Sequence, residues 1–169
     1  SLHQVHGADV VFVDTPGGGN GSDADAAVTA TVGVVLAIHT ADCAPVLLSD
    51  PAVGVIGAAH AGWQGTESGV VEATVAAMIT LGADPLRIDA HVGPCISPDA
   101  YECSVGDLTR LALRHGPEVV AATVTGAPAF DLRAAVRSTL LISGLRPDAI
   151  EFDPRCTALT VEDGAPLFY

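Results

Sequence analysis

Two apolar runs separated by a turn sequence occupy the stretch from His39 to Gly65. Residues 50–54, DPAVG, combine a turn-starting carboxylate, a proline with a fixed φ and a glycine that tolerates positive φ. Apolar runs on both sides of such a turn are typical of a β-hairpin. The pattern therefore predicts two antiparallel strands that fold back on each other.

The predicted register of this hairpin brings two reactive side chains together. With the turn centred between Pro51 and Ala52, Cys43 lies directly opposite His60. Cross-strand partners have Cβ atoms about 4.5–5.5 Å apart and point to the same face of the sheet. The thiol and the imidazole would then share a metal ion or contact each other, whereas a slip of one residue would turn them to opposite faces.

The remaining segments predict an alternation of strands and helices. Apolar or β-branched runs predict strands within residues 3–14, 33–40, 87–92 and 149–153, and at Phe168-Tyr169. Capping residues and amphipathic patterns predict helices over residues 69–82, 104–115 and 132–144. Residues 15–23 read as a glycine-rich surface loop, and residues 24–32 fit either a short helix or a strand.

This order of elements predicts an α/β (α+β) fold. Hairpin-linked strands with interspersed helices favour mixed β-sheets with helices on the outer faces, in a layered α/β/β/α sandwich. The chain has 169 residues, about half of them apolar, which suits one domain over residues 1–169. Because the chain lacks an initiator methionine and stops in an apparent strand, we expect the natural domain to extend beyond both ends.

The net charge of the chain indicates which binding partners are disfavoured, and the spacing of its cysteines indicates the cellular compartment. The chain has 20 acidic residues against seven arginines, and it has no lysine. A nucleic-acid partner is disfavoured because phosphate binding needs clustered basic residues. No apolar run of about 18 residues and no signal sequence is present, so we expect no membrane partner. The four cysteines lack a disulfide framework, which favours reduced thiols in a soluble cytoplasmic protein.

The candidate chemistry depends on six histidines and four cysteines. The hairpin singles out Cys43 and His60, and the polar motif QVHG before a strand singles out His6. On spacing alone, a metal or nucleophile pair and a hydrogen-bonded core pair both remain open. Cys95 lies between a strand end and a loop, where it is a candidate for lining a site. Cys156 is expected to be a small core residue.

Short motifs along nearly the whole chain resemble the signature of the laccase-domain family. In order they are QVHG at 4–7, DADAAVT at 23–29, TADCAPVLL at 40–48, AAHAGWQGT at 58–66, GPCIS at 93–97, YEC at 101–103 and FDL at 130–132. These proteins were first labelled multicopper polyphenol oxidoreductases, and some are described as zinc-containing purine nucleoside phosphorylases with adenosine deaminase activity. The resemblance implies a metal held by His6, Cys43 and His60, and a purine nucleoside and phosphate as substrates.

Two departures from the family pattern concern the phosphate. The family often has an arginine where Gln64 follows Trp63, and a Ser/Arg-rich stretch normally follows the Phe-Tyr at positions 168 and 169. Phosphate-binding residues can therefore not be assigned from this chain. The oligomeric state is likewise left open.

The ligand set favours catalytic zinc over copper. Three Cys/His ligands leave the fourth tetrahedral position open to water, which is the catalytic pattern for zinc. Cys43 and His60 are then the candidate catalytic residues, and Trp63 with Cys95 the candidate substrate-binding residues, the tryptophan by stacking on a purine. A multicopper centre needs many more histidines than the six present, many of them in H-x-H pairs, so copper is the less favoured metal.

Two other functions fit the same residues. In a metal-free hydrolase or amidase, Cys43 would be the nucleophile and His60 the base. The family's fold is similar to that of deamidase toxins that use a Cys/His pair, which makes this the main alternative. In a binding protein with a zinc-stabilised hairpin, Cys95 or Asp42 would close the site as a fourth ligand.

Overall fold

A mixed six-stranded sheet runs through the computed structural model, which describes residues 1–168 of the chain. Its strand order is β1-β2-β4-β3-β5-β8, and two ribbons, β6-β7 and β10-β9, lie outside it. The strands are β1 (Val10–Phe12), β2 (Ala26–Thr29), β3 (Ala44–Asp50), β4 (Val55–Ala61), β5 (Asp89–Val92), β6 (Val120–Ala122), β7 (Pro128–Phe130), β8 (Ile150–Phe152), β9 (Val161–Glu162) and β10 (Ala165–Pro166). The α-helices are α1 (Trp63–Ser68), α2 (Val70–Thr80), α3 (Val105–His115) and α4 (Leu132–Ile142). Short 3-10 turns occupy Pro85–Arg87, Pro117–Val119 and Pro147–Ala149.

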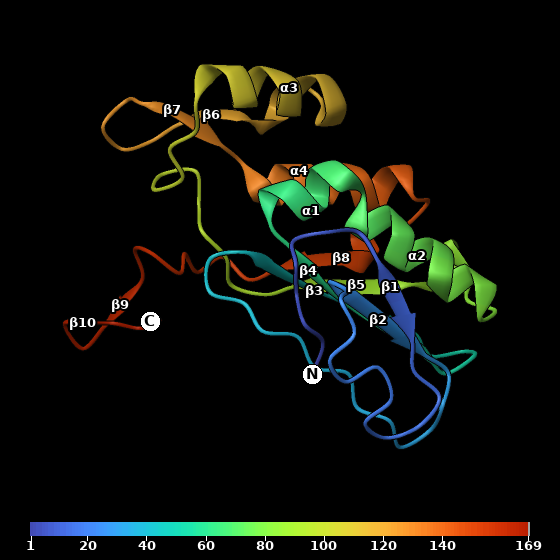
Figure 1. Cartoon of the computed structure of the whole chain (residues 1–169). Coiled ribbons are helices and arrows are strands. Elements are labelled where there is room, and N and C mark those ends of the chain that lie inside the picture. The colour runs from blue at the N-terminus through green and yellow to red at the C-terminus, as the bar shows by residue number, and fades with distance from the viewer. Residues whose placement is uncertain (169) are drawn as a thin grey trace.

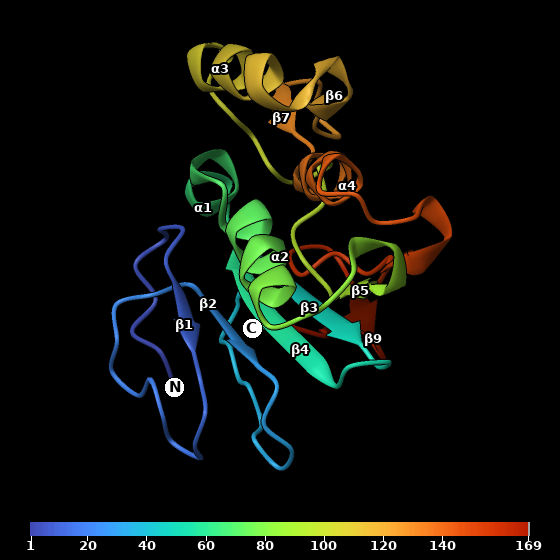
Figure 2. The ribbon, with the colours of Figure 1, turned by 90° about the vertical axis from the view of Figure 1, so that its right-hand side faces the viewer.

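Helices α1, α2 and α4 lie on the same side of this sheet (Figure 1). Helix α2 approaches β4 so closely that a Cβ at Gly57 would come within 2.9 Å of the Met78 sulfur. The strands bury the side chains that point toward these helices, as the alternation of exposed His91 with buried Ala90 and Val92 in β5 illustrates. The main core therefore lies between the sheet and the helices. Helix α3 and the β6-β7 ribbon stack farther out, beyond α4 (Figure 2).

The other face of the sheet is covered by no helix within residues 1–168. Leu47 is 47% exposed there, although its neighbours Val46 and Leu48 are buried on the helix side. The parallel pairs β1-β2 and β5-β8 join antiparallel pairs in one sheet, so the predicted α/β class with a mixed sheet is confirmed. None of the helices in the described part of the chain has the length and apolar character needed to cross a bilayer.

The hairpin β3-β4 forms as predicted, but its register differs by two residues. Asp50 pairs with Val55, so the turn is centred between Ala52 and Val53 and His60 pairs with Pro45 rather than Cys43. The Asp50 carboxylate accepts a hydrogen bond from the N–H of Ala52, which extends the turn. Because side chains alternate with a period of two, this shift leaves Cys43 on the His60 side of the hairpin.

Two further expectations about local structure are wrong. Residues 33–40 form an irregular connection rather than a buried strand, and Val35 is 87% exposed. The connection finds no internal place in the sheet, because β2 already lies between β1 and β4, and β3 between β4 and β5. At the other end of the chain, β10 stops at Pro166 and Phe168 is outside any strand, whereas Tyr169 lies outside the described residues.

The helix predictions agree with the structure, with additions. Side chains of Ser104 and Asp131 cap α3 and α4 by accepting hydrogen bonds from N–H groups of the first turn. The helix predicted over residues 69–82 is α2, and residues 24–32 contain strand β2. Helix α1 and the β6-β7 ribbon were not predicted, because each is too short to give a clear periodic pattern.

Candidate metal site

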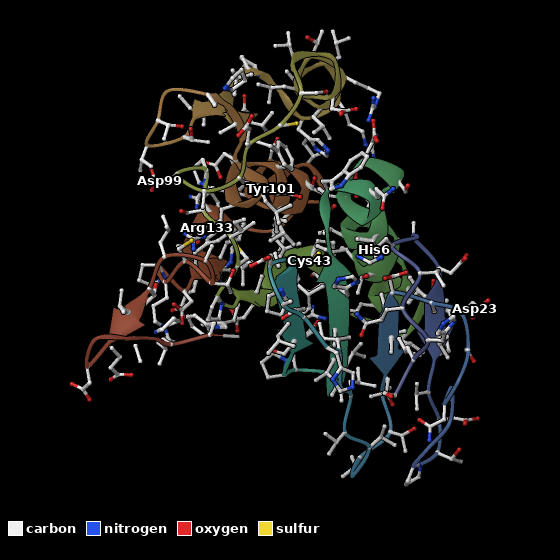
Figure 3. The ribbon with its side chains drawn as sticks, turned by 60° about the vertical axis from the view of Figure 1, so that its left-hand side comes forward. His6, Asp23, Cys43, Asp99, Tyr101 and Arg133 are labelled. Atoms are coloured by element: carbon white, nitrogen blue, oxygen red, sulfur yellow. The ribbon has the colours of Figure 1, made fainter. Side chains whose placement is uncertain are left out.

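Three segments that are distant in sequence bring His6, Cys43 and His60 together at one end of the sheet. His6 precedes β1, Cys43 lies immediately before β3, and His60 is in β4. Their nitrogen and sulfur ligand atoms all lie within 4.8 Å of one another, and the two imidazole rings meet edge-on with centroids 4.8 Å apart. Figure 3 shows His6 and Cys43 side by side above the strands. These are the three residues that the sequence singled out as metal ligands.

Asp25 organises this cluster from a fully buried position immediately before β2. One carboxylate oxygen accepts hydrogen bonds from His60 Nδ1 at 2.7 Å and from the backbone N–H of His6 at 3.0 Å. The other accepts from the N–H groups of Val5 and Gly7 at 3.1 and 2.7 Å. Burial opposes ionisation of Asp25, but these hydrogen bonds from His60 and from the backbone outweigh it and lower the pKa of the carboxyl.

The contact with Asp25 fixes which atom of His60 can bind a ligand. Because Nδ1 is held by the carboxylate, Nε2 is the nitrogen that remains for a metal or a proton acceptor. Metal-binding histidines in proteins almost always have such a carboxylate, carbonyl or water partner on the other ring nitrogen. The sequence motif at 23–29 contained Asp25, but only the structure reveals this role.

His6 has a backbone conformation that residues other than glycine rarely adopt. Its φ is +60°, in the left-handed region, which costs a non-glycine residue about 1–3 kcal/mol. Three consecutive N–H groups, those of Val5, His6 and Gly7, converge on the Asp25 carboxylate and hold this turn. The same buried carboxylate therefore positions one imidazole through its ring and the other through its backbone.

Gly62 provides the space for the Cys43 sulfur. A Cβ at position 62 would lie 2.8 Å from Cys43 Sγ and 3.3 Å from His6 Cδ2. Gly62 is also the N-cap residue of α1, with an ordinary φ of −82°. A glycine is therefore needed at position 62 because the Cys43 sulfur lies so close to the backbone, and not because of an unusual φ angle.

The Cys43 thiol has an environment that disfavours a free thiolate. Burial raises its pKa, and the negative charges of Asp42 and Asp25 raise it further. The segment that bears it is fixed by two hydrogen bonds to Asp42: Ile96 N–H donates to its carbonyl at 2.9 Å and Thr157 Oγ1 to its carboxylate at 2.6 Å.

The cluster suits a metal with borderline-soft ligand preferences. Two imidazoles and one thiolate are ligands for zinc and for copper, and the Asp25 contact supplies the expected support. Within residues 1–168, the cluster contains no fourth His, Cys, Asp or Glu ligand. Cys95 is fully buried outside the cluster, and the Asp42 carboxylate accepts a hydrogen bond from Thr157. A closed structural zinc site would require a fourth protein ligand. Within residues 1–168, neither Cys95 nor Asp42 supplies one.

The aromatic residues near the cluster are Trp63 and Tyr101. Trp63 is half-buried at the start of α1, and the Arg110 guanidinium lies 5.8 Å from its ring centroid. Tyr101 comes from the loop before α3 and lies above Cys43 in Figure 3. Burial and the nearby Cys43 raise the pKa of Tyr101 above its ordinary value. Sequence reasoning gave Tyr101 no role, and its only signal was its place in the YEC motif.

Two hollows differ in their relation to the cluster. One, of about 630 Å³, lies on the helix-free face of the sheet around Leu47 and His91. A second, of about 320 Å³, is lined by Thr40, Ala41 and Phe168, and so borders the segment that leads to Cys43. Ligand pockets commonly measure about 300–1,000 Å³, so the second hollow is large enough to hold a small molecule.

Fold and site together define a mixed α/β protein with a candidate His-Cys-His metal site. The family model described as "Multi-copper polyphenol oxidoreductase laccase" matches residues 1–163. The chain belongs to this laccase-like family.

Named relatives point toward nucleoside chemistry. "Purine nucleoside phosphorylase ORF3" of Streptomyces griseus is 46% identical over 147 residues, which are 85% of this chain and 59% of the relative. "Adenosine deaminase RL5" from an unknown prokaryotic organism is 37% identical over 138 residues, 79% of this chain and 52% of the relative. The chain thus spans between half and three fifths of these two relatives.

A solved structure agrees with the fold. The crystal structure of YlmD from Geobacillus stearothermophilus superposes with a TM-score of 0.80 at 32% identity. The match covers 90% of this chain and 61% of that protein.

Proposed function

We propose that the protein is a zinc-dependent enzyme of purine nucleoside metabolism, with phosphorolysis as its main reaction and deamination of adenosine as a second. The observation that carries the proposal is the convergence of His6, Cys43 and His60, with Asp25 behind them, in a chain whose relatives are named for these two activities. Phosphorolysis converts a nucleoside and phosphate into a free purine and ribose 1-phosphate. Deamination converts adenosine and water into inosine and ammonia.

The roles of the chain's own residues follow from their contacts. His6, Cys43 and His60 would hold the zinc ion, which when bound acts as a Lewis acid and lowers the pKa of water. Asp25 keeps the Nδ1 proton on His60 and so leaves Nε2 as the ligand atom. Half-buried Cys43 and exposed His6 leave one side of the cluster open toward solvent, where a substrate can approach.

Substrate binding is assigned to residues around the cluster. The hollow beside Thr40 and Ala41 is wide enough for a nucleoside, and Phe168 offers an aromatic face within it. Trp63 is proposed as a second stacking residue, on the ring face that Arg110 does not cover. Cys95 is fully buried, so it would support the wall of the site without touching the substrate.

A metal-free Cys/His hydrolase remains the second candidate because of one feature. Asp25, His60 and Cys43 lie in the order of a carboxylate, a base and a nucleophile, which is the arrangement of hydrolytic triads. His6 has no role in such a triad, however, although its ring is in edge-on contact with that of His60. Nucleophilic catalysis also favours a lowered thiol pKa, whereas that of Cys43 is raised.

The test is a chromatographic assay of the purified protein, loaded with zinc, on inosine and adenosine with and without phosphate. The proposal expects hypoxanthine and ribose 1-phosphate from inosine only when phosphate is present, and loss of turnover after chelation. Release of ammonia from adenosine without phosphate would identify the second reaction. Turnover of neither nucleoside by the zinc-loaded protein would overturn the proposal. A metal-free protein whose Cys43 is rapidly alkylated would favour the hydrolase.

A further inference from the structure

A second pair of cysteines, outside the candidate metal site, lies where the β5–α3 loop meets the chain after β8. Cys95 and Cys156 face each other in an isolated parallel β-bridge, and the N–H of Thr157 donates to the Cys95 carbonyl at 3.3 Å. Paired residues of parallel strands point their side chains to the same face, and neighbouring strands lie about 4.8 Å apart. Disulfides join residues whose Cα atoms are about 4.4–6.8 Å apart, and the spacing of paired strands falls in this range, so the bridge allows a disulfide between Cys95 and Cys156.

The sulfur of Cys156 lies in a group of hydrogen-bond donors. The N–H of Ser97 donates to it at 3.2 Å. Burial opposes the thiolate, but hydrogen bonds from Ser97 and from the backbone of Ala158 and Leu159 outweigh it, and the pKa of Cys156 is lowered. Its side of the bridge is also ordered, because the N–H of Cys156 donates to Thr160 Oγ1 at 2.9 Å. Cys156 as a whole is 7% exposed, so only a small reagent can approach it.

Cys95 has the complementary character. It is fully buried, and burial raises its pKa even though the Arg133 guanidinium lies beside it and acts in the opposite direction. Arg133 also ties the two segments together, since its Nη2 donates to the carbonyls of Cys95 at 3.2 Å and Arg155 at 2.6 Å. Figure 3 shows Arg133 away from Cys43 and His6. The pKa of one thiol of the pair is thus lowered and that of the other is raised.

We propose that Cys95 and Cys156 form a redox-active thiol pair that hydrogen peroxide converts into a disulfide. The Cys156 thiolate attacks one peroxide oxygen, the O–O bond breaks, and the departing hydroxide takes up a proton to become water. The resulting sulfenic acid is then attacked by the Cys95 sulfur, which loses its proton as the S–S bond forms and a second water leaves. Two thiols are oxidised and one peroxide is reduced to two water molecules.

The pair is coupled to the candidate metal site through Asp42. Ile96, next to Cys95, and Thr157, next to Cys156, each donate a hydrogen bond to Asp42, which precedes Cys43. Formation of the S–S bond brings the two sulfurs to about 2.0 Å from each other and fixes the torsion angles of both side chains, so the neighbouring residues that hold Asp42, and the loop that bears Cys43, must shift. Oxidation of the pair therefore weakens metal binding at a site that it does not touch.

The experiment is peptide mapping after a short exposure of the folded chain to hydrogen peroxide, followed by alkylation of the remaining thiols. Trypsin yields residues 88–110, which hold Cys95 and Cys103, and a separate peptide that begins at Cys156. The proposal expects these two peptides to be cross-linked in the wild type and in Cys103→Ser, and separate in Cys95→Ser. A cross-link that persists in Cys103→Ser identifies Cys95 as the partner of Cys156. Because this variant keeps both cysteines of the pair, the conclusion does not depend on whether Cys95→Ser folds.

Several results would contradict the proposal. Recovery of Cys156 as an alkylated thiol under conditions that oxidise Cys103 would overturn it, as would a sulfinic acid at Cys156 beside a free Cys95. The coupling has its own measurement, which is zinc affinity by competition with a chromophoric chelator. Oxidised protein should bind zinc at least about tenfold more weakly, and a thiol reductant should restore the affinity. Equal affinity in both forms would overturn the coupling.

Discussion

Cys43 and Cys156 are two partly or fully buried thiols in one small protein with opposite electrostatic surroundings. Cys43 has the carboxylates of Asp42 and Asp25 nearby, and its pKa is raised by burial and by their charge. Cys156 is surrounded by hydrogen-bond donors from Ser97 and the following turn, and its pKa is lowered in spite of burial. Burial raises the pKa of both thiols, the charges of Asp42 and Asp25 add to this effect at Cys43, and the hydrogen-bond donors around Cys156 reverse it.

The comparison separates two kinds of sulfur chemistry. Within residues 1–168, none of the groups that shift the pKa of Cys43 is positively charged, so a cation shared with His6 and His60 is the partner that would stabilise its thiolate. Cys156 has donors for its own thiolate and needs no metal. We therefore propose metal binding for the first thiol and redox chemistry for the second.

The largest expected effect comes from exchanging each sulfur for oxygen. Cys43→Ser should reduce zinc content from about one ion per chain to almost none, because a hydroxyl is a far poorer zinc ligand than a thiolate. Cys156→Ser should retain the zinc. Elemental analysis after dialysis measures both variants, with circular dichroism as the check on folding. Equal zinc content in the two variants would remove the basis for the assignment.

A smaller loss is expected when the carboxylate behind the ligands is changed. Asp25→Asn should lower zinc affinity by about 10–100-fold, because the amide no longer accepts all four hydrogen bonds that orient His60 and the His6 turn. Asp23→Asn is the matched control, since the Asp23 carboxylate bonds, within residues 1–168, only the exposed ring of His3. Chelator competition on the two variants gives the comparison, and similar affinities would show that Asp25 does not position the site.

A smaller change, in stability, is expected when the space next to the Cys43 sulfur is filled. Gly62→Ala places a methyl group 2.8 Å from the sulfur and should cost about 1–3 kcal/mol of unfolding free energy in the metal-free chain. Gly106→Ala is the control, because its nearest neighbour would lie 4.0 Å away. Denaturant unfolding measures both. Equal stabilities would mean that the sulfur moves aside without strain.

The smallest effect on the site is expected at the far end of the same hairpin. Asp50 accepts hydrogen bonds from Arg87 and from the N–H of Asp84, which lower its pKa. A lowered pKa stabilises the fold above the unfolded value of about 3.9, and this stabilisation disappears as the pH falls through the folded value. Asp50→Asn should therefore be less stable than the wild type at pH 7, with the gap narrowing toward pH 3. Its zinc affinity at pH 7 should be unchanged.

Sequence patterns were sufficient for the elements that they mark strongly. The turn at residues 50–54, the caps Ser104 and Asp131 and the helical periodicities predicted the hairpin and three helices. Side chains of a strand alternate between its two faces with a period of two residues. The error of two residues in the predicted register therefore left Cys43 on the same face of the hairpin as His60. The candidate ligands could be named in advance for this reason.

What the sequence could not predict depends on tertiary contacts. The apolar run at residues 33–40 has a strand's composition, but every internal strand position near it is filled. Asp25 looks like any acidic residue until folding brings three backbone N–H groups and His60 to it. Cys156 was expected to be a plain core residue, because the donors around its sulfur come from a distant loop and from its own turn.

The central claim is that one sulfur and two imidazoles bind a single metal ion. X-ray absorption at the zinc edge of the zinc-loaded chain tests it most directly. The account predicts one sulfur neighbour at about 2.3 Å and two nitrogen neighbours at about 2.0–2.1 Å, with the remaining neighbour a light atom. A spectrum without sulfur, or with two or more sulfurs around each zinc, would contradict it.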